Sequence, residues 1–327
     1  MSVAWGIFST AAINDLVLAG AAATDACEVV AVASRDAARA EAYAREHGIE
    51  RAHGSYEALL EDPNVEAVYI PLPNSLHMPW TLRAVEAGKH VLCEKPFSRH
   101  ADQVEEAFER AEAAGLVVSE GFMWRHHPQT AKLVELVQSG AIGRLRVVRC
   151  QFGFDLEIER GAADTRFDPE LDGGALMDVG CYCINAMRLL AGEPERVSSE
   201  QVVGPTGVDV VFAGTLAFAD DVVGHFHCGF VFPRSAELEV VGASGTILVR
   251  NPWVIEEPAI ELRRDGDEAE RISVDDADSY RLELENVSGA IRNEVPLLLG
   301  RGDAVGQART IEALYEAAGA GQAVPTD

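Results

Sequence analysis

The chain has 327 residues, of which 48% are hydrophobic and 24% charged, and its 53 Asp and Glu residues outnumber 27 Lys and Arg residues to give a formal net charge of -26. This excess of negative charge repels phosphate backbones and anionic lipid, so nucleic acid and membrane surfaces are poor candidate partners, and no apolar run reaches the ~18–20 residues of a membrane span. The length suggests two domains, because a single core stops growing near ~250–300 residues.

No basic segment precedes the first apolar run, so we expect no signal peptide and a cytoplasmic protein. Reducing compartments keep cysteines as thiols, and a small thiol side chain packs well in a core. We therefore expect six reduced, buried cysteines: Cys27, Cys93, Cys150, Cys181, Cys183 and Cys228.

Short runs rich in Val and Ile alternate with helical segments in the first third of the chain. Strands are predicted at 3–8, 28–33, 65–70, 90–93 and 116–119, and helices at about 13–21, 37–47, 56–60, 80–87 and 104–114. This alternation indicates right-handed βαβ crossovers and a parallel sheet. We predict an α/β fold in which residues 1–122 form a doubly wound Rossmann domain that binds a dinucleotide.

Beyond Phe122 the pattern changes to long strands with few helices. Strands are predicted at 145–154, 200–203, 208–218, 222–232, 236–241, 246–249 and 260–264, and helices at about 128–139, 174–190, 280–299 and 305–318. The turns are rich in Gly and Asp, as in hairpins, and the acidic segment 265–278 is predicted to be a solvated loop. Residues 123–327 are thus expected to form an α+β substrate-binding and oligomerisation domain on a large, mostly antiparallel open sheet.

The turn after the first strand is the expected position of the cofactor pyrophosphate, which binds at a helix N-terminus. If Ser9, Ala11 and Asn14 occupy the three usual glycine positions, small side chains at Ser9 and Ala11 still allow a close approach. The hydroxyls of Ser9 and Thr10 could donate to phosphate, and Ile13 begins the apolar pattern of the helix. The alternative is a plain strand-to-helix turn.

The end of the second strand points to the identity of the dinucleotide. An acid usually stands here when the ribose 2′-hydroxyl is bound, whereas this chain has Ser34 and Arg35, with Arg39 one turn later. An arginine fork suits a 2′-phosphate, which predicts a preference for NADP over NAD. The alternative is that Ser34 or Asp36 only caps the next helix and Arg35 is solvated.

Chemistry is expected at the carboxyl ends of the third, fourth and fifth predicted strands, where ligands bind in open α/β sheets. The fourth ends in Glu94-Lys95-Pro96, which places one of only three lysines at this edge, and Pro96 could follow a cis bond that orients Lys95. Further candidates near the cofactor lie after the third strand and where the chain enters the second domain: Pro71, Leu72, Asn74, His77, Trp124 and Arg125.

In the second domain, a Gly-Gly pair precedes a helix that carries Asp178 and Tyr182. These two residues are four apart, so both can point toward one ligand. With the distant Glu94-Lys95-Pro96, this pattern resembles the glucose–fructose oxidoreductase, inositol dehydrogenase and rhizopine-catabolism (Gfo/Idh/MocA) family. The strings Gly-Gly-Ala-Leu-x-Asp-x-Gly-x-Tyr-Cys-x-Asn, Met-Trp-Arg-x-x-Pro and Trp-Gly-Ile-x-Ser-Thr-Ala are most similar to its dihydrodiol dehydrogenase and D-xylose dehydrogenase branch.

The resemblance covers essentially the whole chain and implies that Lys95 is the catalytic lysine and Tyr182 the catalytic acid/base. The departures are Phe8 and the segment 12–14 in the opening turn, and a shortened segment around 157–164. A tyrosine with a pKa of ~10 is a poor base at neutral pH, but an adjacent ammonium favours the phenolate. Asp178 could then accept a substrate hydroxyl or orient Lys95.

The leading function is an NADP-dependent oxidoreductase acting on a sugar, polyol or dihydrodiol, with NAD as a possible cofactor. A cofactor-retaining glycoside hydrolase of the same fold and a non-catalytic dinucleotide sensor are the alternatives. His225 and His227 share a strand face, but no third ligand accompanies them, so we expect no metal site. The alternating antiparallel strands predict a homodimer or a higher homo-oligomer.

Overall fold

In a computed structural model, which describes residues 2–320, the chain divides into two compact units. The first comprises the described residues up to His127 together with Ala277–Val305, and the second comprises Pro128–Asp276 together with the described residues from Gly306. The sequence predicted one boundary, between residues 122 and 123. The structure differs, because it places 277–305 in the first unit.

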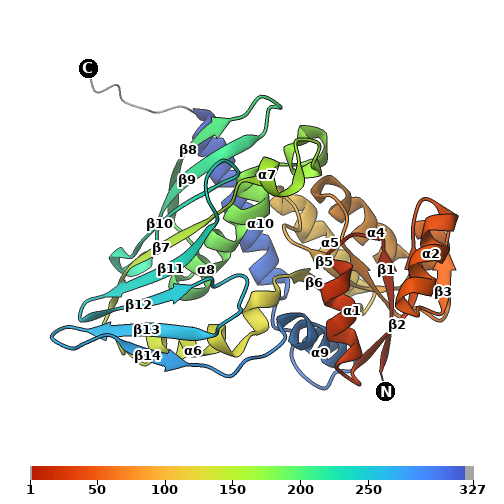
Figure 1. Ribbon diagram of the computed structural model, residues 1–327, viewed down its shortest axis with the longest axis horizontal. Coiled ribbons are helices and arrows are strands. Elements are labelled where there is room, and N and C mark those ends of the chain that lie inside the picture. The colour runs from red at the N-terminus through yellow and green to blue at the C-terminus, as the bar shows by residue number, and fades with distance from the viewer. Residues whose placement is uncertain (1, 321–327) are drawn as a thin grey trace. The chain divides into compact units, whose positions relative to one another are not determined.

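A six-stranded parallel sheet with the order β3-β2-β1-β4-β5-β6 forms the centre of the first unit (Figure 1). Its strands are β1 (Val3–Phe8), β2 (Cys27–Ala33), β3 (Arg51–His53), β4 (Ala67–Ile70), β5 (His90–Glu94) and β6 (Val118–Gly121). Because β1 pairs in parallel with both β2 and β4, the strand order reverses beside β1, and ligands of such sheets bind outside the carboxyl ends of the strands at this point. The predicted doubly wound parallel sheet is confirmed.

The helices that connect these strands match the predicted ones to within a few residues. They are α1 (Asn14–Ala22), α2 (Ala37–His47), α3 (Tyr56–Leu60), α4 (His77–Glu86) and α5 (Ala101–Ala113). The edge strand β3 was not predicted, since its three residues are only half-buried and contain no apolar run. A residue pattern reveals a strand only where one face is buried.

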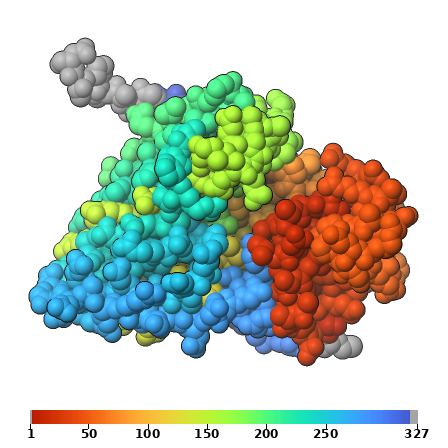
Figure 2. All heavy atoms as spheres, viewed as in Figure 1, coloured from red at the N-terminus to blue at the C-terminus, as the bar shows by residue number. Residues whose placement is uncertain are grey.

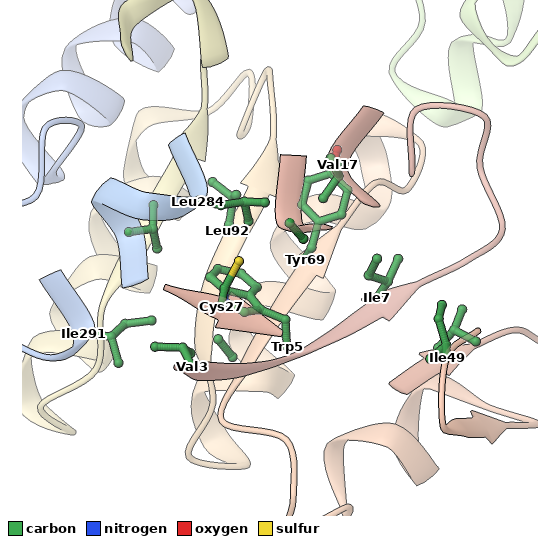
Figure 3. Close-up of a cluster of buried hydrophobic side chains, with 14 of the residues drawn as sticks. Val3, Trp5, Ile7, Val17, Cys27, Ile49, Tyr69, Leu92, Leu284 and Ile291 are labelled. Atoms are coloured by element: carbon green, nitrogen blue, oxygen red, sulfur yellow. The ribbon is translucent and has the colours of Figure 1, made fainter. Parts of the chain in front are cut away.

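Helix α9 (Ser279–Ile291) completes the core of the first unit although it lies far along the chain. Its buried residues Leu284, Val287 and Ile291 pack into the same cluster as side chains from β1 and β2 (Figure 3). The indole nitrogen of Trp5 donates to the Ser288 hydroxyl at 3.2 Å inside this core. Each fully buried aliphatic side chain stabilises the fold by roughly 1.5–3 kcal/mol, which explains why this helix belongs to the first unit.

The second unit contains an eight-stranded sheet with the order β14-β13-β12-β11-β7-β10-β9-β8 (Figure 1). Its strands are β7 (Leu145–Gly153), β8 (Arg196–Val203), β9 (Asp209–Ala217), β10 (Val223–Gly229), β11 (Ser235–Gly242), β12 (Gly245–Arg250), β13 (Ala259–Arg264) and β14 (Glu270–Ser273). The neighbours are antiparallel except for β7 and β10, which run parallel. The predicted mostly antiparallel sheet is confirmed.

Besides α9, four further α-helices follow the first 127 residues in the described part of the chain, and the structure differs from the prediction at two places there. The helices are α6 (Pro128–Gln138), α7 (Leu156–Arg160), α8 (Cys181–Ala191) and α10 (Arg301–Ala320). The predicted solvated loop at 265–278 is wrong in part, because it contains β14, a polar edge strand that pairs with β13. The helix predicted at 280–299 ends at Ile291.

Candidate functional site

The turn after β1 is held in a conformation that normally calls for glycine. Ser9 has a φ of 64° and its hydroxyl donates to the Pro71 carbonyl at 3.3 Å. The fully buried Asn14 donates from Nδ2 to the Ser9 carbonyl at 3.1 Å. No side chain caps the N-terminus of α1, so the positive end of its dipole faces this turn. The chain thus keeps the shape of a phosphate-binding turn without the glycine fingerprint.

At the end of β2 the structure bears out part of the simpler alternative, since the Asp36 carboxylate caps α2 by accepting from the Arg39 amide at 3.2 Å. The Ser34 hydroxyl is buried and accepts from the Asp36 amide at 3.3 Å. The side chains of Arg35 and Arg39 are exposed, and neither forms an ion pair with any residue between 2 and 320. Both guanidinium groups act on the hydroxyl of Tyr56, whose pKa burial raises and these charges lower. Two unpaired positive charges therefore lie beside the end of β2.

The segments after β4 and β5 are joined through a buried histidine. The His77 ring is 1% exposed, and its Nδ1 and Nε2 lie 2.8 and 2.6 Å from the carbonyl oxygens of Pro96 and Leu72. The His77 ring thereby joins the two segments, and its predicted place near the cofactor remains a prediction. The Lys95–Pro96 bond is cis, as the sequence suggested.

The carboxylate before Lys95 is fixed on both of its oxygens. The Tyr69 hydroxyl donates to Glu94 Oε1 at 2.6 Å, and the Lys95 amide donates to Oε2 at 3.3 Å. Burial and the Glu94 charge raise the pKa of Tyr69 well above its ordinary value, so its phenol remains a proton donor to Glu94. A neighbouring carboxylate, Glu120, accepts from the Phe97 amide at 2.8 Å. Glu94 thereby holds the backbone of the predicted catalytic lysine.

The strand β6 leads into a short 3₁₀ turn, Met123–His126, that contains three residues of interest. Trp124 is 1% exposed, and its predicted contact with the cofactor remains a prediction. Arg125 Nη1 donates to Asp303 Oδ2 at 2.9 Å. His126 Nε2 lies 4.0 Å from Glu283 Oε1, and both side chains are buried. Glu283 was not predicted from the sequence, because no motif includes it.

In the second unit, Asp178 and Tyr182 lie on successive turns where the helix changes type. Asp178 belongs to a π-helical turn, Leu176–Gly180, and Tyr182 to the first turn of α8. Single π turns are frequent at functional sites. The Tyr182 ring packs against Phe152 at 5.5 Å and Trp253 at 5.7 Å between centroids, which fixes its orientation.

The structure also reveals a partner of Asp178 that the sequence analysis missed. Arg166 Nε donates to Asp178 Oδ2 at 2.9 Å, and Arg166 Nη1 donates to the Asp164 carboxylate oxygens at 3.1 and 3.2 Å. The two carboxylates, Asp178 first, raise the pKa of Arg166 above its ordinary value. Asp178 is therefore an ion-pair partner, and its predicted direct role in catalysis remains a prediction.

The predicted Lys95–Tyr182 pair remains a prediction as well, because Lys95 belongs to the first unit and Tyr182 to the second. Among residues 2–320, no group of three or more His, Cys, Asp or Glu side chains is arranged to hold a metal ion. His225 and His227 lie on the exposed face of β10. All six cysteines are free and buried, as predicted.

Two family descriptions match the chain in order. "Oxidoreductase family, NAD-binding Rossmann fold" matches residues 5–122, and "GFO/IDH/MocA C-terminal domain" matches residues 130–248. The chain belongs to the Gfo/Idh/MocA family of oxidoreductases. The resemblance noted from the Glu94-Lys95-Pro96 and Asp178-x-Gly-x-Tyr182 strings is confirmed.

Individual members of the Gfo/Idh/MocA family are similar along most of the chain. D-xylose 1-dehydrogenase (NADP(+)) 2 of Haloferax volcanii is 40% identical over 99% of both chains. A trans-1,2-dihydrobenzene-1,2-diol dehydrogenase of Mus musculus is 36% identical over 81% of this chain and 79% of its own. The crystal structure of a 3-ketoreductase from Actinomadura kijaniata, in complex with NADP and TDP-benzene, has a TM-score of 0.91 at 29% identity and covers 97% of this chain and 98% of that one. No helix within residues 2–320 is long and apolar enough to cross a membrane.

Proposed function

We propose that the protein is an NADP-dependent oxidoreductase that transfers hydride between the nicotinamide and a hydroxyl-bearing carbon of a sugar, polyol or dihydrodiol. The observation that carries this proposal is the place of Lys95, at the carboxyl end of β5 in a sheet whose order reverses beside β1. This edge is where dinucleotides and their substrates meet in open α/β sheets. The similarity to an NADP-linked D-xylose dehydrogenase over nearly the whole chain supports the same reaction class.

The choice of NADP is supported by the arginines after β2. Arg35 and Arg39 are exposed and form no ion pair within the described chain, although its acidic residues outnumber its basic residues almost two to one. An anionic 2′-phosphate would supply the missing counter-charge. Ser9, Thr10, Ala11 and Ile13 at the turn, and Pro71, Leu72 and Asn74 after β4, are proposed to contact the rest of the cofactor.

In the proposed mechanism Tyr182 takes the proton of the reacting hydroxyl while the carbon loses its hydride. Bound NADP would supply the hydride acceptor, or, as NADPH, the hydride donor. The Lys95 ammonium favours the phenolate form of the tyrosine by charge, and in the reductive direction the phenol returns its proton to the developing alkoxide. Phe152 and Trp253 hold the Tyr182 ring so that little ordering remains when substrate binds.

The test is the absorbance of reduced nicotinamide, with NADP and NAD in parallel, over a panel of aldoses, polyols, inositols and dihydrodiols. Reduction of NADP by one substrate class is expected. Hydrolysis of a glycoside with no net change in NADPH would instead identify a hydrolase that retains its cofactor. Tight cofactor binding without any turnover would identify a sensor.

We also propose that the protein is a cytoplasmic homo-oligomer. The six buried free thiols suit a reducing compartment. The outer edge of the large sheet exposes apolar residues, with Val202 and Val203 on β8 more than half exposed, and such residues are commonly covered by a second subunit. Sedimentation equilibrium should give a mass at least twice that of one chain. A monomer at micromolar concentration would contradict the oligomer.

A further inference from the structure

The loop between α7 and the helix of Asp178 lies at the surface of the second unit (yellow-green in Figure 2) and is held together by contacts to the Arg166 backbone. The Arg166 carbonyl accepts from the Gly174 amide at 3.0 Å, and Asp164 Oδ1 accepts from the Arg166 amide at 2.9 Å. A Cβ at Gly173 would lie 2.4 Å from the Arg166 carbonyl oxygen, so only glycine fits there. The Gly-Gly motif therefore serves to bring this arginine against the helix that carries Asp178.

One nitrogen of the Arg166 guanidinium, Nη2, is not used in the contacts with the two aspartates. Nε is used by Asp178 and Nη1 by Asp164, whereas Nη2 makes no hydrogen bond to any residue within 2–320. The side chain is 38% exposed, so the two N–H donors of Nη2 can reach a ligand. Because both aspartates fix the guanidinium plane, little rotamer freedom is lost when Nη2 binds.

A fixed donor thus lies beside a carboxylate acceptor, one helical turn before Tyr182. A donor and an acceptor side by side match two adjacent hydroxyl groups, because each hydroxyl can both accept and donate. The charges of Asp164, Arg166 and Asp178 sum to -1, within a chain whose formal net charge is -26. This group therefore offers no net attraction to a phosphate or a pyrophosphate.

We propose that Arg166 Nη2 and the Asp178 carboxylate together bind two adjacent hydroxyls of an uncharged substrate, and so select vicinal diols over deoxygenated or phosphorylated analogues. This inference rests on the proposed oxidoreductase function of the Tyr182 site. Arg166 acts here as a specificity residue that touches the substrate, while Asp164 is a positioning residue that acts through Arg166.

The experiment compares D-xylose, 2-deoxy-D-xylose and D-xylose 5-phosphate as substrates of the wild type and of Arg166→Met. The matched control is Arg160→Met, which removes the same charge from an exposed arginine at the end of α7, just before this loop. Arg166→Met is expected to lower kcat/KM for D-xylose about tenfold to a hundredfold, mainly through KM, with an unchanged Kd for NADP. The preference for D-xylose over 2-deoxy-D-xylose should largely disappear in Arg166→Met. Arg160→Met should retain the wild-type kcat/KM for D-xylose and the wild-type preference.

A second variant tests the charge argument on its own. Asp164→Asn brings the sum of the three charges from -1 to zero, so its kcat/KM for D-xylose 5-phosphate relative to D-xylose should rise severalfold. If Arg166→Met does not fold, Arg166→Lys, which keeps the charge but lacks the fork, is judged by the same loss of preference.

The possible failures are distinguishable. A wild type that reduces NADP but retains its selectivity after Arg166→Met, or loses activity equally on both sugars, overturns the role of Arg166 alone. A wild type that uses D-xylose 5-phosphate as well as D-xylose overturns the proposed selection against phosphorylated analogues. No reduction of NADP by any sugar, polyol or dihydrodiol would overturn the proposed function itself.

Discussion

Burial decides the charge of a glutamate and a histidine that face each other in the first unit. Glu283 and His126 are almost fully buried, with 4.0 Å between Oε1 and Nε2. Burial, and next the charge of Glu94, raises the pKa of Glu283 well above its ordinary value. Burial, and next the charge of Arg125, lowers the pKa of His126 to about 4. At neutral pH His126 is therefore uncharged, and this contact is not an ion pair.

The raised pKa of Glu283 predicts a pH dependence of stability. Above the ordinary value of 4.5 the unfolded chain releases this proton while the folded chain keeps it, so the free energy of unfolding falls as pH rises toward the folded pKa. Glu283→Gln removes this dependence and should be more stable relative to wild type at pH 8 than at pH 5, as measured by urea unfolding. The exposed Glu294→Gln is the control.

His126 contributes a slope of the opposite sign. Its lowered pKa means that stability is lost as pH falls from 6.5 toward about 4. Because wild type and Glu283→Gln both keep His126, the difference between their unfolding curves isolates the glutamate. Parallel curves for the two proteins from pH 5 to pH 8 would show that Glu283 is ionised in the fold.

The proposed acid/base is tested by removing one oxygen. Tyr182→Phe should lower turnover by about 10²–10⁴-fold, since general acid–base catalysis contributes that much, and leave the Kd for NADP unchanged. Tyr43→Phe, on α2, is the control for loss of a tyrosine hydroxyl. Near-normal turnover of Tyr182→Phe would remove this residue from the mechanism.

The arginines after β2 give a separate prediction about the cofactor. Arg35→Gln should weaken NADP binding about tenfold or more while NAD binding changes little, because a hydrogen-bonded charge contact contributes about 1.5–3 kcal/mol. Arg45→Gln on α2 is the control, since that side chain is exposed and lies near Glu41. Calorimetric titration gives both constants, and equal or tighter NAD binding by wild type would contradict the preference.

The sequence marked candidate site residues where a motif or a strand end singled them out, and it did not mark Arg166 or Glu283. Lys95 and Tyr182 stand in recognisable strings, and Arg35 follows an apolar strand. Arg166 and Glu283 stand in no motif. The partner of Glu283 comes from a segment far away in the chain, the 3₁₀ turn of His126, and sequence spacing does not encode such a contact. The partners of Arg166 are nearer, at Asp164 and Asp178, but they depend on the fold of an irregular loop.

At the scale of elements, apolar runs predicted the buried strands and failed for the polar edge strands β3 and β14. The helix α9 was predicted at nearly its right place but in the wrong domain, because its apolar face fits any core of suitable shape. Its real position depends on a close approach to α1. A Cβ at Gly20 would lie 2.7 Å from the Arg281 amide nitrogen, a backbone atom that cannot turn aside.

This contact predicts that Gly20→Ala destabilises the protein although alanine is the better helix former. The gain in helix propensity is about 1 kcal/mol, whereas overpacking costs about 1–3 kcal/mol, so the free energy of unfolding should fall. Gly302→Ala in α10, where nothing lies within 4 Å of the new methyl group, should leave it equal or higher. Denaturant unfolding of both variants makes the comparison, and a stabilised Gly20→Ala would contradict the packing argument.

At the scale of the whole molecule, the net negative charge predicts how stability and NADP binding depend on salt. A formal net charge of -26 on 327 residues means strong self-repulsion, which salt screens with a Debye length of about 10 Å at 0.1 M. We expect Tm to rise as NaCl increases from 0.05 to 2 M, and NADP binding to weaken over the same range. Scanning calorimetry measures the first, with equimolar uncharged sucrose increments as the control. A falling Tm would mean that the surface ion pairs outweigh the repulsion.

The packing of α9 in the first unit has a consequence for synthesis on the ribosome. The strands of the first sheet emerge early, but Leu284 and Val287, which bury part of its core, are added only after most of the second unit has been translated. The nascent first unit therefore exposes part of its apolar core to solvent until residues 277–305 have been synthesised. Truncated chains that stop before residue 277 should bind chaperones and aggregate, whereas the full chain can complete its first unit.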